Sequence, residues 1–367
     1  MIVLANVDGM RAALAAVSSV VPARSPKPVL QSVLLTANEN DVTLTANDLE
    51  VSIVYHVSGV QVDQPGRVLL PYAKFREIVS RVHCLDIAIE LAGDKILIKT
   101  DKGKFNLPSE DPDTFPVAVP FSSANYQVCD SKSLGMAIER TEFATDPNST
   151  RFALAGVQFL LQPDSLGLVA TDARRLASQP VAGVTTHGDI EAISEVVSLK
   201  TLKAMQKVLG DGTVHLYMTG NSIHFRTDRA VIYGRLVEGR FPSYSDVIPS
   251  NRKTTFSVKA RDFLDALNQA AVTTSEESRG LLCKFFADGR ALISSKTEIG
   301  NSEIELQVEW ASGACDTQVT FDYRLIADGV AKMDGTIQMA LQGEKGAGLI
   351  TDDAGYEYVV MPLTKEA

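Results

Sequence analysis

Side chains that could catalyse a reaction are present in this sequence, but their spacing matches no known catalytic or metal-binding motif. The histidines show no spacing typical of a nucleophile and its base or of a metal site, and neither G-x-S-x-G nor G-x-G-x-x-G occurs. The cysteines form no C-x-x-C pair, so we interpret them as reduced thiols in the core. These residues are His56, His83, His187, His215 and His224, with Cys84, Cys129, Cys283 and Cys315. We expect no enzymatic activity of the chain itself, no metal site and no cofactor.

Two short polar stretches resemble ligand-binding loops only in part. "GEKGAG" (343–348) is rich in glycine, but it lacks the G-K-[ST] order of a phosphate loop and lies between strand-like segments. We therefore expect a hairpin turn there. "SEDPDT" (109–114) carries carboxylates that could bind a cation, although its composition is more typical of a solvated loop.

Two adjacent arginines, Arg174 and Arg175, lie where a strand-like run breaks into a turn, in "LVATDARRLA" (168–177). An alternating apolar run, a polar turn and a second alternating run also occur in "VTLTANDLEVSIVYHV" (42–57) and in "ALISSKTEIGNSEIELQV" (291–308). The turns, marked by Asp48, Asp172 and Thr297, follow one another at nearly even intervals. The chain therefore contains an internal repeat.

The elements around these turns recur at the same interval. A hairpin-like phrase that ends in Phe-Pro occurs at 95–116 and 222–244, and a third copy at 336–362 matches in pattern. Apolar stripes predict helices near residues 8–21, 73–82, 131–144, 199–209, 260–272 and 322–333, two in each repeat. Short alternating strands, such as one over 303–310, fill most of the remainder. We predict an α+β fold of three repeated modules, residues 1–120, 121–251 and 252–367, each with two helices and antiparallel sheets.

The composition is that of a globular protein, with 45% hydrophobic and 22% charged residues. No run of 18 apolar residues occurs, and the N-terminus lacks the basic and apolar regions of a secretory signal. We expect a cytoplasmic protein without a membrane segment. The net charge of −10 argues against general adhesion to nucleic acid.

One predicted helix nevertheless has a basic face. Lys200, Lys203 and Lys207 follow i, i+3, i+7, and an apolar stripe lies opposite, formed by Leu199, Leu202, Met205 and Leu209. Such a face is either an ordinary solvated surface or a local basic surface on an acidic protein.

Motifs from all three repeats resemble those of one family, the bacterial DNA sliding clamp, the β subunit of replicative DNA polymerase III. "ATDARRLA" is similar to the clamp's A-T-D-G-H-R-L-A, and "LTANDLEVSI" to its first-domain L-T-A-T-D-L-E. "LVEGRFPSYSDVIP" (236–249) resembles L-V-D/E-G-R-F-P-x-Y-x-x-V-I/L-P, and "YVVMPL" (358–363) resembles Y-V/L-V/L-M-P. The motifs keep their order and spacing, so the resemblance covers the whole chain.

This resemblance implies a fold and a function. Six similar domains from a head-to-tail homodimer would form a ring, half of it from each chain, with helices lining a hole for double-stranded DNA. Contacts to DNA would be independent of sequence. The ring would be a non-catalytic processivity factor, which tethers the DNA polymerase III α subunit, the clamp loader, other polymerases and repair proteins through short peptide motifs.

The resemblance also implies a cleft for those peptides, with an apolar groove and with Arg175 at its rim to orient a backbone or a carboxylate. The cleft residues would be Leu154, Thr171, Arg175, Leu176, Pro242, Val247, Val359, Met361 and Pro362. Ala173 and Arg174 replace the usual Gly-His, Asp246 stands where a base is common, and "TKEA" replaces a terminal Arg-Leu. We therefore expect an apolar floor with an altered rim.

Two further sets of residues combine this matching with the patterns in the sequence. The DNA-facing residues would be Arg24 and Asn148, by the same matching, with Lys200, Lys203 and Lys207 on the basic helix face. The dimer interface would comprise Lys74, Lys102, Lys104, Phe105, Leu107, Val272, Thr273, Glu298 and Glu303. In this set Phe105 and Leu107 would pack against Val272 and Thr273 of the other subunit, and Thr273 replaces a larger apolar residue.

One alternative to a working clamp stays open at this point. A clamp-like interaction protein or decoy could bind clamp partners without encircling DNA. Loading on circular DNA would distinguish the two.

Overall fold

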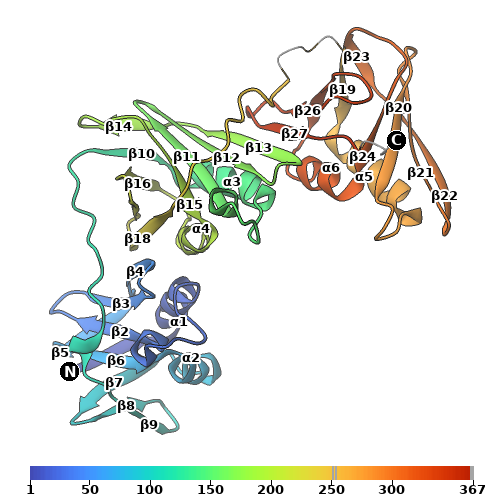
Figure 1. Cartoon of the computed structure of the whole chain (residues 1–367). Helices are drawn as coiled ribbons and strands as arrows, with labels where there is room; N and C mark the ends of the chain where they lie inside the picture. The colour runs from blue at the N-terminus through green and yellow to red at the C-terminus, as the bar shows by residue number, and fades with distance from the viewer. Residues whose placement is uncertain (250–251, 253, 364–367) are drawn as a thin grey trace. The chain divides into compact units, whose positions relative to one another are not determined.

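The computed structural model describes residues 1–249, 252 and 254–363 (Figure 1). Contacts divide the chain into two compact units, each of which contains segments that are distant in sequence. Unit 1 comprises Met1–Gly135, Leu161–Asp164 and Ala182–Val237, and unit 2 comprises Met136–Leu160, Ser165–Val181 and Glu238–Ala367. The boundaries of the three repeated modules stay a prediction.

All six helices expected from the apolar stripes are confirmed among the described residues. They are α1 (Val7–Val17), α2 (Tyr72–Arg81), α3 (Ser131–Thr141), α4 (Leu199–Gln206), α5 (Ala260–Ala270) and α6 (Tyr323–Val330). The stripes over 131–144 and 260–272 continue as 3-10 turns, η3 (Glu142–Ala144) and η5 (Ala271–Thr273). Apolar spacing does not separate the end of an α-helix from such a turn, which explains the longer predicted ranges.

Unit 1 consists largely of antiparallel strands. One sheet has the order β5-β1-β7-β8-β9. A second run of paired strands has the order β6-β2-β3-β4-β18-β17-β16-β10-β14, with β15 beside β18. The bounds are β1 (Ile2–Asn6), β2 (Ser32–Ala37), β3 (Val42–Asn47), β4 (Val51–His56), β5 (Val60–Gln64), β6 (Gly66–Pro71), β7 (Asp86–Ala92), β8 (Lys95–Lys99), β9 (Lys104–Pro108), β10 (Tyr126–Asp130), β14 (Thr185–His187), β15 (Ile193–Ser198), β16 (Thr213–Met218), β17 (Ser222–Arg226) and β18 (Ala230–Val237). Helix α1 packs against α2, β3 and β4.

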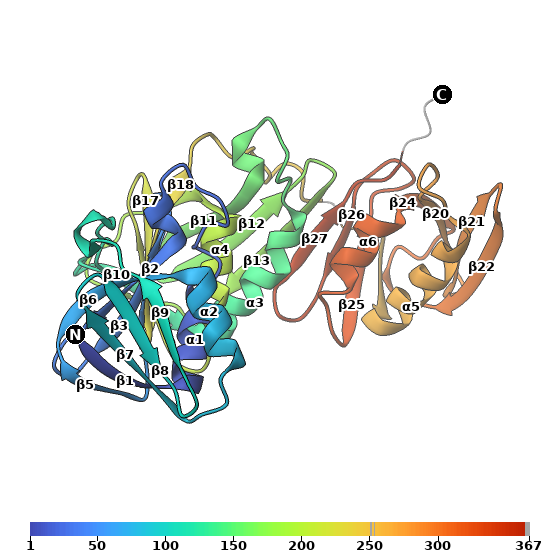
Figure 2. The same ribbon diagram turned by 90° about the horizontal axis from the view of Figure 1, so that it is seen from below.

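Unit 2 is built in the same way. Paired strands follow the order β12-β13-β27-β26-β25-β19-β23, and a separate sheet has the order β22-β21-β20-β24. Helices α5 and α6 lie side by side, and α5 packs against β21 and β22 (Figure 2). The bounds are β12 (Ser165–Thr171), β13 (Arg175–Val181), β19 (Thr254–Lys259), β20 (Gly280–Phe285), β21 (Arg290–Thr297), β22 (Gly300–Gln307), β23 (Glu309–Ser312), β24 (Thr317–Asp322), β25 (Thr336–Leu341), β26 (Gly348–Thr351) and β27 (Glu357–Val360), while β11 (Gly156–Gln162) is shared between the units.

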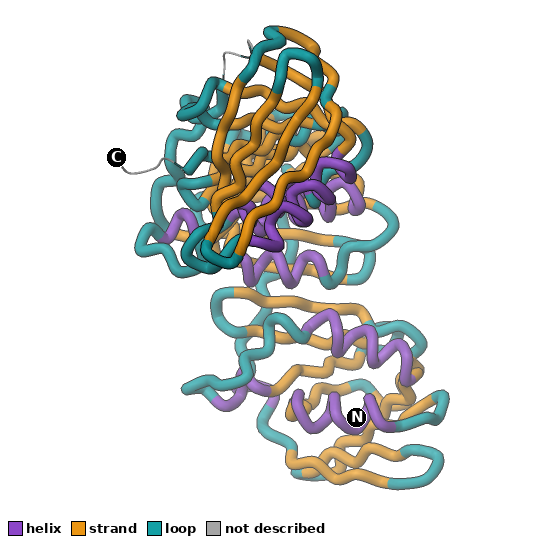
Figure 3. Tube along the Cα trace, turned by 90° about the vertical axis from the view of Figure 1, so that its right-hand side faces the viewer, coloured by secondary structure: helices purple, strands orange, loops and turns teal. Residues whose placement is uncertain are grey.

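The fold is therefore α+β with mainly antiparallel sheets, as predicted, and strands predominate over helices in both units (Figure 3). "GEKGAG" joins the antiparallel strands β25 and β26, which confirms the expected hairpin turn. Within the described chain, no helix has the length and apolar character that crossing a membrane requires.

The strand expected over 303–310 is wrong in one respect, because it is two strands. β22 pairs with β21, whereas β23 pairs with β19. Between them, buried Val308 donates its backbone N–H to the Gly289 carbonyl at 2.8 Å. The alternation continues through this point because Val308 stays buried, so the pattern alone could not locate the change of sheet.

The expectation of core thiols holds for only part of the set. Cys129 and Cys283 are buried, and burial raises the pKa of each thiol to about 12. Cys315 is exposed and Cys84 is half-buried. A cysteine in a short strand or loop gives no local signal of which side it faces.

The turn that marks the repeat is held by its own side chains. Between β3 and β4, Asn47 Oδ1 accepts a hydrogen bond from the Leu49 N–H at 2.8 Å. Asp48 Oδ1 accepts from the N–H groups of Glu50 and Val51, at 3.0 and 2.6 Å. Leu49 adopts a left-handed backbone conformation, with φ 79°. This is an Asx-type turn, which fixes where β4 begins.

Candidate functional site

The turn between β12 and β13 repeats this construction at the site that the sequence singled out. Thr171 Oγ1 accepts from the Ala173 N–H at 3.1 Å, and Asp172 Oδ1 accepts from the N–H groups of Arg174 and Arg175 at 2.9 and 3.0 Å. Ala173 has φ 72°, a conformation that favours glycine. The two arginines of this turn are therefore fixed at the backbone.

A pocket of about 180 Å³ lies in unit 2 beside this turn. Its walls come from the 3-10 turn η4 (Phe152–Ala155) and the residue before it, from the turn after β12, from the segment after β18, and from the end of β27. The lining residues are Arg151, Leu154, Thr171, Ala173, Arg174, Arg175, Leu176, Pro242, Ser243, Tyr244, Val247, Val359 and Met361.

The structure brings together eight of the nine residues expected in a peptide cleft, because every one except Pro362 lines this pocket. Pro362 instead forms a bridge with Phe321 on β24. Arg151, Ser243 and Tyr244 also line the pocket and were not expected there, and Tyr244 belongs to the "FPSYSDVIP" motif that could have indicated it.

The floor of the pocket is apolar. Leu154, Leu176 and Val359 are buried, whereas Val247 and Met361 are 44% and 40% exposed. Exposed apolar side chains around a buried apolar floor can bury a Leu-sized or Phe-sized side chain of a ligand, which is favourable by about 1.5–3 kcal/mol per residue. The pocket can therefore hold apolar anchors of a peptide.

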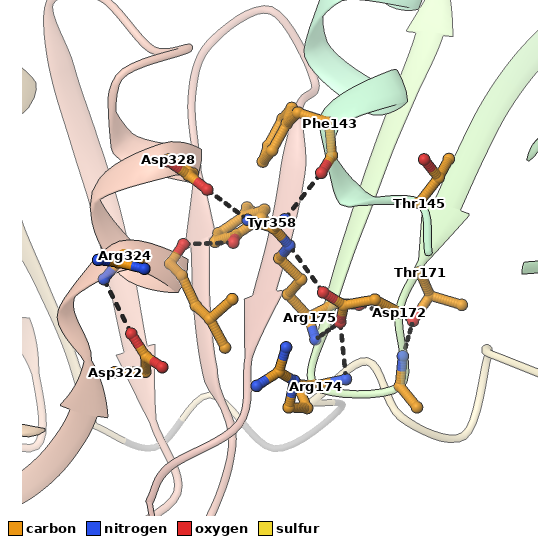
Figure 4. Close-up of polar contacts among 12 residues, drawn as sticks. Phe143, Thr145, Thr171, Asp172, Arg174, Arg175, Asp322, Arg324, Asp328 and Tyr358 are labelled. Carbon is orange, nitrogen blue, oxygen red and sulfur yellow. Dashed lines mark hydrogen bonds and ion pairs between the residues drawn. The ribbon is translucent and has the colours of Figure 1, made fainter. Parts of the chain in front are cut away.

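Arg175 lines the pocket, and the protein itself holds its guanidinium in place. Its guanidinium donates to Asp172 Oδ2 at 3.0 Å, to Asp328 Oδ2 on α6 at 2.7 Å and to the Phe143 carbonyl at 2.8 Å (Figure 4). Burial opposes its charge, but the bond to Asp328 and the carboxylate of Asp172 outweigh that effect and raise the pKa of Arg175. This side chain, 11% exposed, is fixed in the pocket wall by hydrogen bonds from Nε, Nη1 and Nη2.

Arg174 is the arginine of this pair that faces solvent. Its side chain is exposed and lines the pocket, and no ion pair holds it within the described chain. Its carbonyl accepts a hydrogen bond from the Met361 N–H at 2.9 Å, so its backbone is tied to the end of β27.

A buried polar network supports the β27 side of the pocket. Arg140 pairs with Asp352 at 2.8 Å, and the Tyr356 hydroxyl donates to the Arg140 carbonyl at 2.9 Å. Tyr358 donates to the Leu325 carbonyl on α6. Burial raises the pKa values of both tyrosines, so they stay neutral donors. The network holds the β27 segment against α3 and α6.

The residues expected to face DNA fall into two groups. Arg24, Asn148, Lys203 and Lys207 are exposed. Lys200 is not free: its ammonium binds the carboxylate of Asp48, whose side chain is only 8% exposed. Lys200 therefore joins α4 to the first repeated turn, and its role in facing DNA stays a prediction.

Apart from Lys74, the residues expected at a dimer interface lie on or near two sheet edges. β9 is the last strand of its sheet, with Lys102, Lys104 and Phe105 exposed and Leu107 half-buried. β22 is an edge strand of the other sheet, with Glu298 and Glu303 exposed. Lys74, on α2, pairs with Glu77 at 3.3 Å.

Val272 and Thr273, expected to form an apolar surface for the other subunit, differ from each other in their surroundings. Val272 is 78% exposed, so it is available for packing. Thr273 Oγ1 is hydrogen-bonded to the hydroxyls of Ser295 and Ser302, and its carbonyl accepts from Thr297 at 2.6 Å. Thr273, in η5, therefore braces the hairpin of β21 and β22 with its polar atoms, where a larger apolar residue was the family expectation.

Comparisons with known proteins give one consistent result. Residues 3–120 match the family model described as DNA polymerase III beta subunit, N-terminal domain, and residues 129–243 match the central domain. A beta sliding clamp of Halalkalibacterium halodurans is 27% identical over 340 residues, 89% of each chain. The solved DNA polymerase III subunit beta of Pseudomonas aeruginosa is 25% identical, with a TM-score of 0.90 and full coverage of both chains. A second solved structure, a P. aeruginosa sliding clamp bound to griselimycin, is 25% identical with a TM-score of 0.91 and the same coverage.

These matches extend over both units and agree with the motifs of all three repeats. Members of this family are processivity factors and have no catalytic activity of their own. The chain therefore belongs to the DNA polymerase III beta subunit family, the beta sliding clamps.

Proposed function

We propose that two copies of this chain join head to tail into a ring around duplex DNA, and that the pocket tethers polymerases and other proteins to it. Each chain is then a half-ring of three modules, residues 1–120, 121–251 and 252–367. Membership of the family supports this function. The main observation in support of a ring is a pattern of strand pairing that occurs twice within the chain.

The strand that follows a repeated turn pairs with the last described strand of the next module. β4 follows the Asp48 turn and pairs with β18, where Val51 lies opposite Gly234. β13 follows the Asp172 turn and pairs with β27, where Arg175 lies opposite Val360. Both pairings are antiparallel. One kind of joint is therefore used twice within the chain.

The third turn lacks this joint among the described residues. Thr297 Oγ1 accepts from the Ile299 N–H at 3.2 Å, as in the other two turns, but β22 pairs only with β21. Among the described strands, β9, the last strand of the first module, pairs only with β8. Unpaired strand edges are ready to add a further strand. Pairing β22 of one copy with β9 of another repeats the joint, and doing so twice closes a ring.

The internal pairs also predict the register of the joint between copies. Asn301 lies four residues after Thr297, as Val51 lies four residues after Asn47, so Asn301 corresponds to Val51. Gly234 lies seven residues before Phe241, as Pro108 lies seven residues before Phe115, so Pro108 corresponds to Gly234. Asn301 then faces Pro108.

Continuing antiparallel from that pair, Ile304 lies opposite Phe105 and Glu305 opposite Lys104. An apolar pair and an oppositely charged pair in these positions are favourable across antiparallel strands. The exposed Lys102 and Glu303 add to the complementary charge of the two edges.

Contact with DNA is proposed to be weak and independent of sequence. Lys203 and Lys207 lie exposed on and after α4, and no ion pair engages them within the described chain. Arg24 and Asn148 supply further exposed donors. Such groups bind phosphates, which carry no sequence information. Retention on DNA then depends on the closed ring.

The pocket is proposed to receive a short peptide motif with apolar anchors. Its partners would be the DNA polymerase III α subunit, the clamp loader, other polymerases and repair proteins. The apolar floor and the fixed wall of Arg175 support this role, because a rigid groove that buries a few apolar side chains is a common means of peptide recognition.

The test compares retention on circular and on linear DNA. The protein is loaded by a clamp loader onto a nicked circle, and its residence is followed by gel filtration before and after a restriction enzyme cuts the circle. We expect long residence on the circle at moderate salt and rapid loss after cutting, because escape from a circle requires the ring to open.

Two variants make the test specific. Lys203→Glu with Lys207→Glu should reduce loading, whereas Lys95→Glu with Lys345→Glu, which changes exposed lysines near hairpin turns, should not. Equal and salt-sensitive retention on circular and cut DNA would indicate an ordinary DNA-binding surface. A protein that binds partner peptides but never loads would be the decoy.

A further inference from the structure

The side chain of Phe121 holds the segment before β10 against the sheet that contains β10, β16 and β17. We call residues 117–125 the linker, because they lie between η2 (Pro112–Thr114) and β10, at the boundary of the proposed first and second modules. The Phe121 ring packs edge-on against Tyr217 on β16 and Tyr126 on β10, with ring centroids 4.9 and 5.9 Å apart. The guanidinium carbon of Arg226, on β17, lies 4.4 Å from the centre of the Phe121 ring, which is a cation–π contact. All of these residues belong to unit 1.

Arg226 is in turn held by His215 on β16. Arg226 Nη2 donates a hydrogen bond to His215 Nδ1. An arginine keeps its protons at any physiological pH, so His215 must accept this bond and is neutral in this arrangement. The His215 ring also stacks on Tyr126, with centroids 5.0 Å apart, so the sheet fixes its position. The contact between Arg226 and Phe121 therefore depends on the protonation state of His215.

A proton on His215 would remove this support. A protonated imidazole has a donor at both nitrogens, so Nδ1 could no longer accept from Arg226, and two positive charges would lie in contact. In the folded chain, burial lowers the pKa of His215, as do the charges of Arg226 and His187, while Asp228 opposes them. The neutral form is thus favoured at neutral pH. The titratable or charged residues that share this face on the neighbouring strands and turns are Tyr126, Asp130, His187, His224, Arg226 and Asp228.

We infer that His215 and Arg226 form a pH-dependent latch on the linker, in which protonation of His215 displaces Arg226 from the Phe121 ring and releases the segment. The linker has no titratable side chain of its own, so its release follows the protonation of the sheet. One proton is taken up on release. The ratio of released to held linker is therefore constant above the ordinary histidine pKa of 6.5 and rises by up to about tenfold per pH unit below it. The inference concerns a single chain and depends neither on the ring nor on the pocket.

A fluorine label on the linker tests the latch in the full-length protein. Cys84→Ser and Cys315→Ser remove the accessible thiols, and Ser122→Cys, at an exposed linker position, takes a trifluoromethyl label. The two buried cysteines should stay unlabelled. The fluorine NMR spectrum is recorded at steps from about pH 8 to about pH 5, with circular dichroism at each pH to verify that the chain remains folded.

We expect a broad signal at high pH and a sharp signal that grows below about pH 6.5, because a released linker moves faster than the folded sheet. His215→Gln offers an acceptor that does not titrate, so its signal should stay broad throughout. Phe121→Ala should give the sharp signal at every pH. His83→Gln, which removes an exposed histidine of unit 1, should leave the response unchanged.

A wild-type spectrum that does not change over this pH range would overturn the inference, as would a response that survives His215→Gln. Two further variants, His187→Gln and His224→Gln, retain His215 and should keep the response. Its loss in either variant would assign the proton to that histidine and overturn the role of His215. These two variants decide the matter if His215→Gln itself releases the linker at every pH.

Discussion

At the scale of single residues, the second repeated turn places an alanine where the backbone conformation favours glycine, and its sequence could only partly reveal this. The motif indicated a turn at Asp172 and an alanine in place of the family's glycine. The structure adds that Ala173 is left-handed, with φ 72°. The contacts of Arg175 were beyond prediction, because Asp328 lies 153 positions away and no local pattern specifies such a partner.

Ala173→Gly is expected to stabilise the protein. A left-handed conformation costs an alanine about 1–2 kcal/mol, and the greater chain entropy of unfolded glycine offsets part of the gain, which leaves about 0.5–1 kcal/mol. The midpoint of urea unfolding of the full-length protein measures it. Ala192→Gly, at an exposed loop position without a left-handed backbone, should be neutral or destabilising. A lower midpoint for Ala173→Gly would contradict the argument.

His224 should make stability depend on pH. It is 6% exposed, stacks on Tyr217 with ring centroids 4.3 Å apart and bonds to Ser222, and burial lowers its pKa below the ordinary 6.5. A histidine with a lowered folded pKa contributes fully above the unfolded pKa, and the contribution is lost as pH falls below about 6.5. The urea midpoint should therefore fall between pH 7.5 and 5. His224→Gln should show a shallower fall, and an identical slope would exclude this residue as a cause.

At the scale of elements, the helices could be predicted because apolar spacing is a local property. All six came from stripes with a period near 3.6 residues. The contacts of the polar side chains on these helices could not be predicted in the same way. The sequence placed three lysines on one helix face, but Lys200 contacts Asp48, 152 positions earlier, while Lys203 and Lys207 stay exposed. Which base is structural depends on a tertiary contact.

Charge reversal should separate these lysines. Lys200→Glu places a second carboxylate beside the nearly buried Asp48, and we expect a loss of about 1–2 kcal/mol in the free energy of unfolding. Lys203→Glu with Lys207→Glu should change that free energy by less than about 0.5 kcal/mol while reducing loading on DNA. Denaturant unfolding and a loading assay give the two readouts. Equal stability losses in both variants would mean that the Asp48 contact does not matter in solution.

At the scale of the whole molecule, the proposed ring depends on a strand joint whose register follows from pairs inside the chain. A cross-link tests that register directly. In a chain with Cys84→Ser and Cys315→Ser, Lys104→Cys with Glu305→Cys should form covalent dimers on mild oxidation, because directly opposite positions have Cβ atoms about 4.5–5.5 Å apart. Cys129 and Cys283 can stay, since both are buried.

The control moves one cysteine by two positions along β22, to a position that is not directly opposite residue 104 in the proposed register. Lys104→Cys with Glu303→Cys places the thiols diagonally, about 7–8 Å apart, and should cross-link far less. Equal yields from both variants would contradict the proposed register, and no dimer from either at micromolar concentration would contradict the joint itself. Denaturing gel electrophoresis without reductant measures the yield.

The joint between β4 and β18 and that between β13 and β27 lie within one covalent chain, whereas the proposed third joint lies between chains. Connected partners meet at a high effective concentration, on the order of millimolar, so the internal joints re-form at once when broken. The joint between copies has no such tether, and its closure depends on protein concentration. In a ring built this way, opening by heat or by an applied force occurs at the two joints between copies. Each chain therefore contains two joints of this kind that its covalent backbone keeps together, and it shares further joints of the same kind that separate when the ring opens.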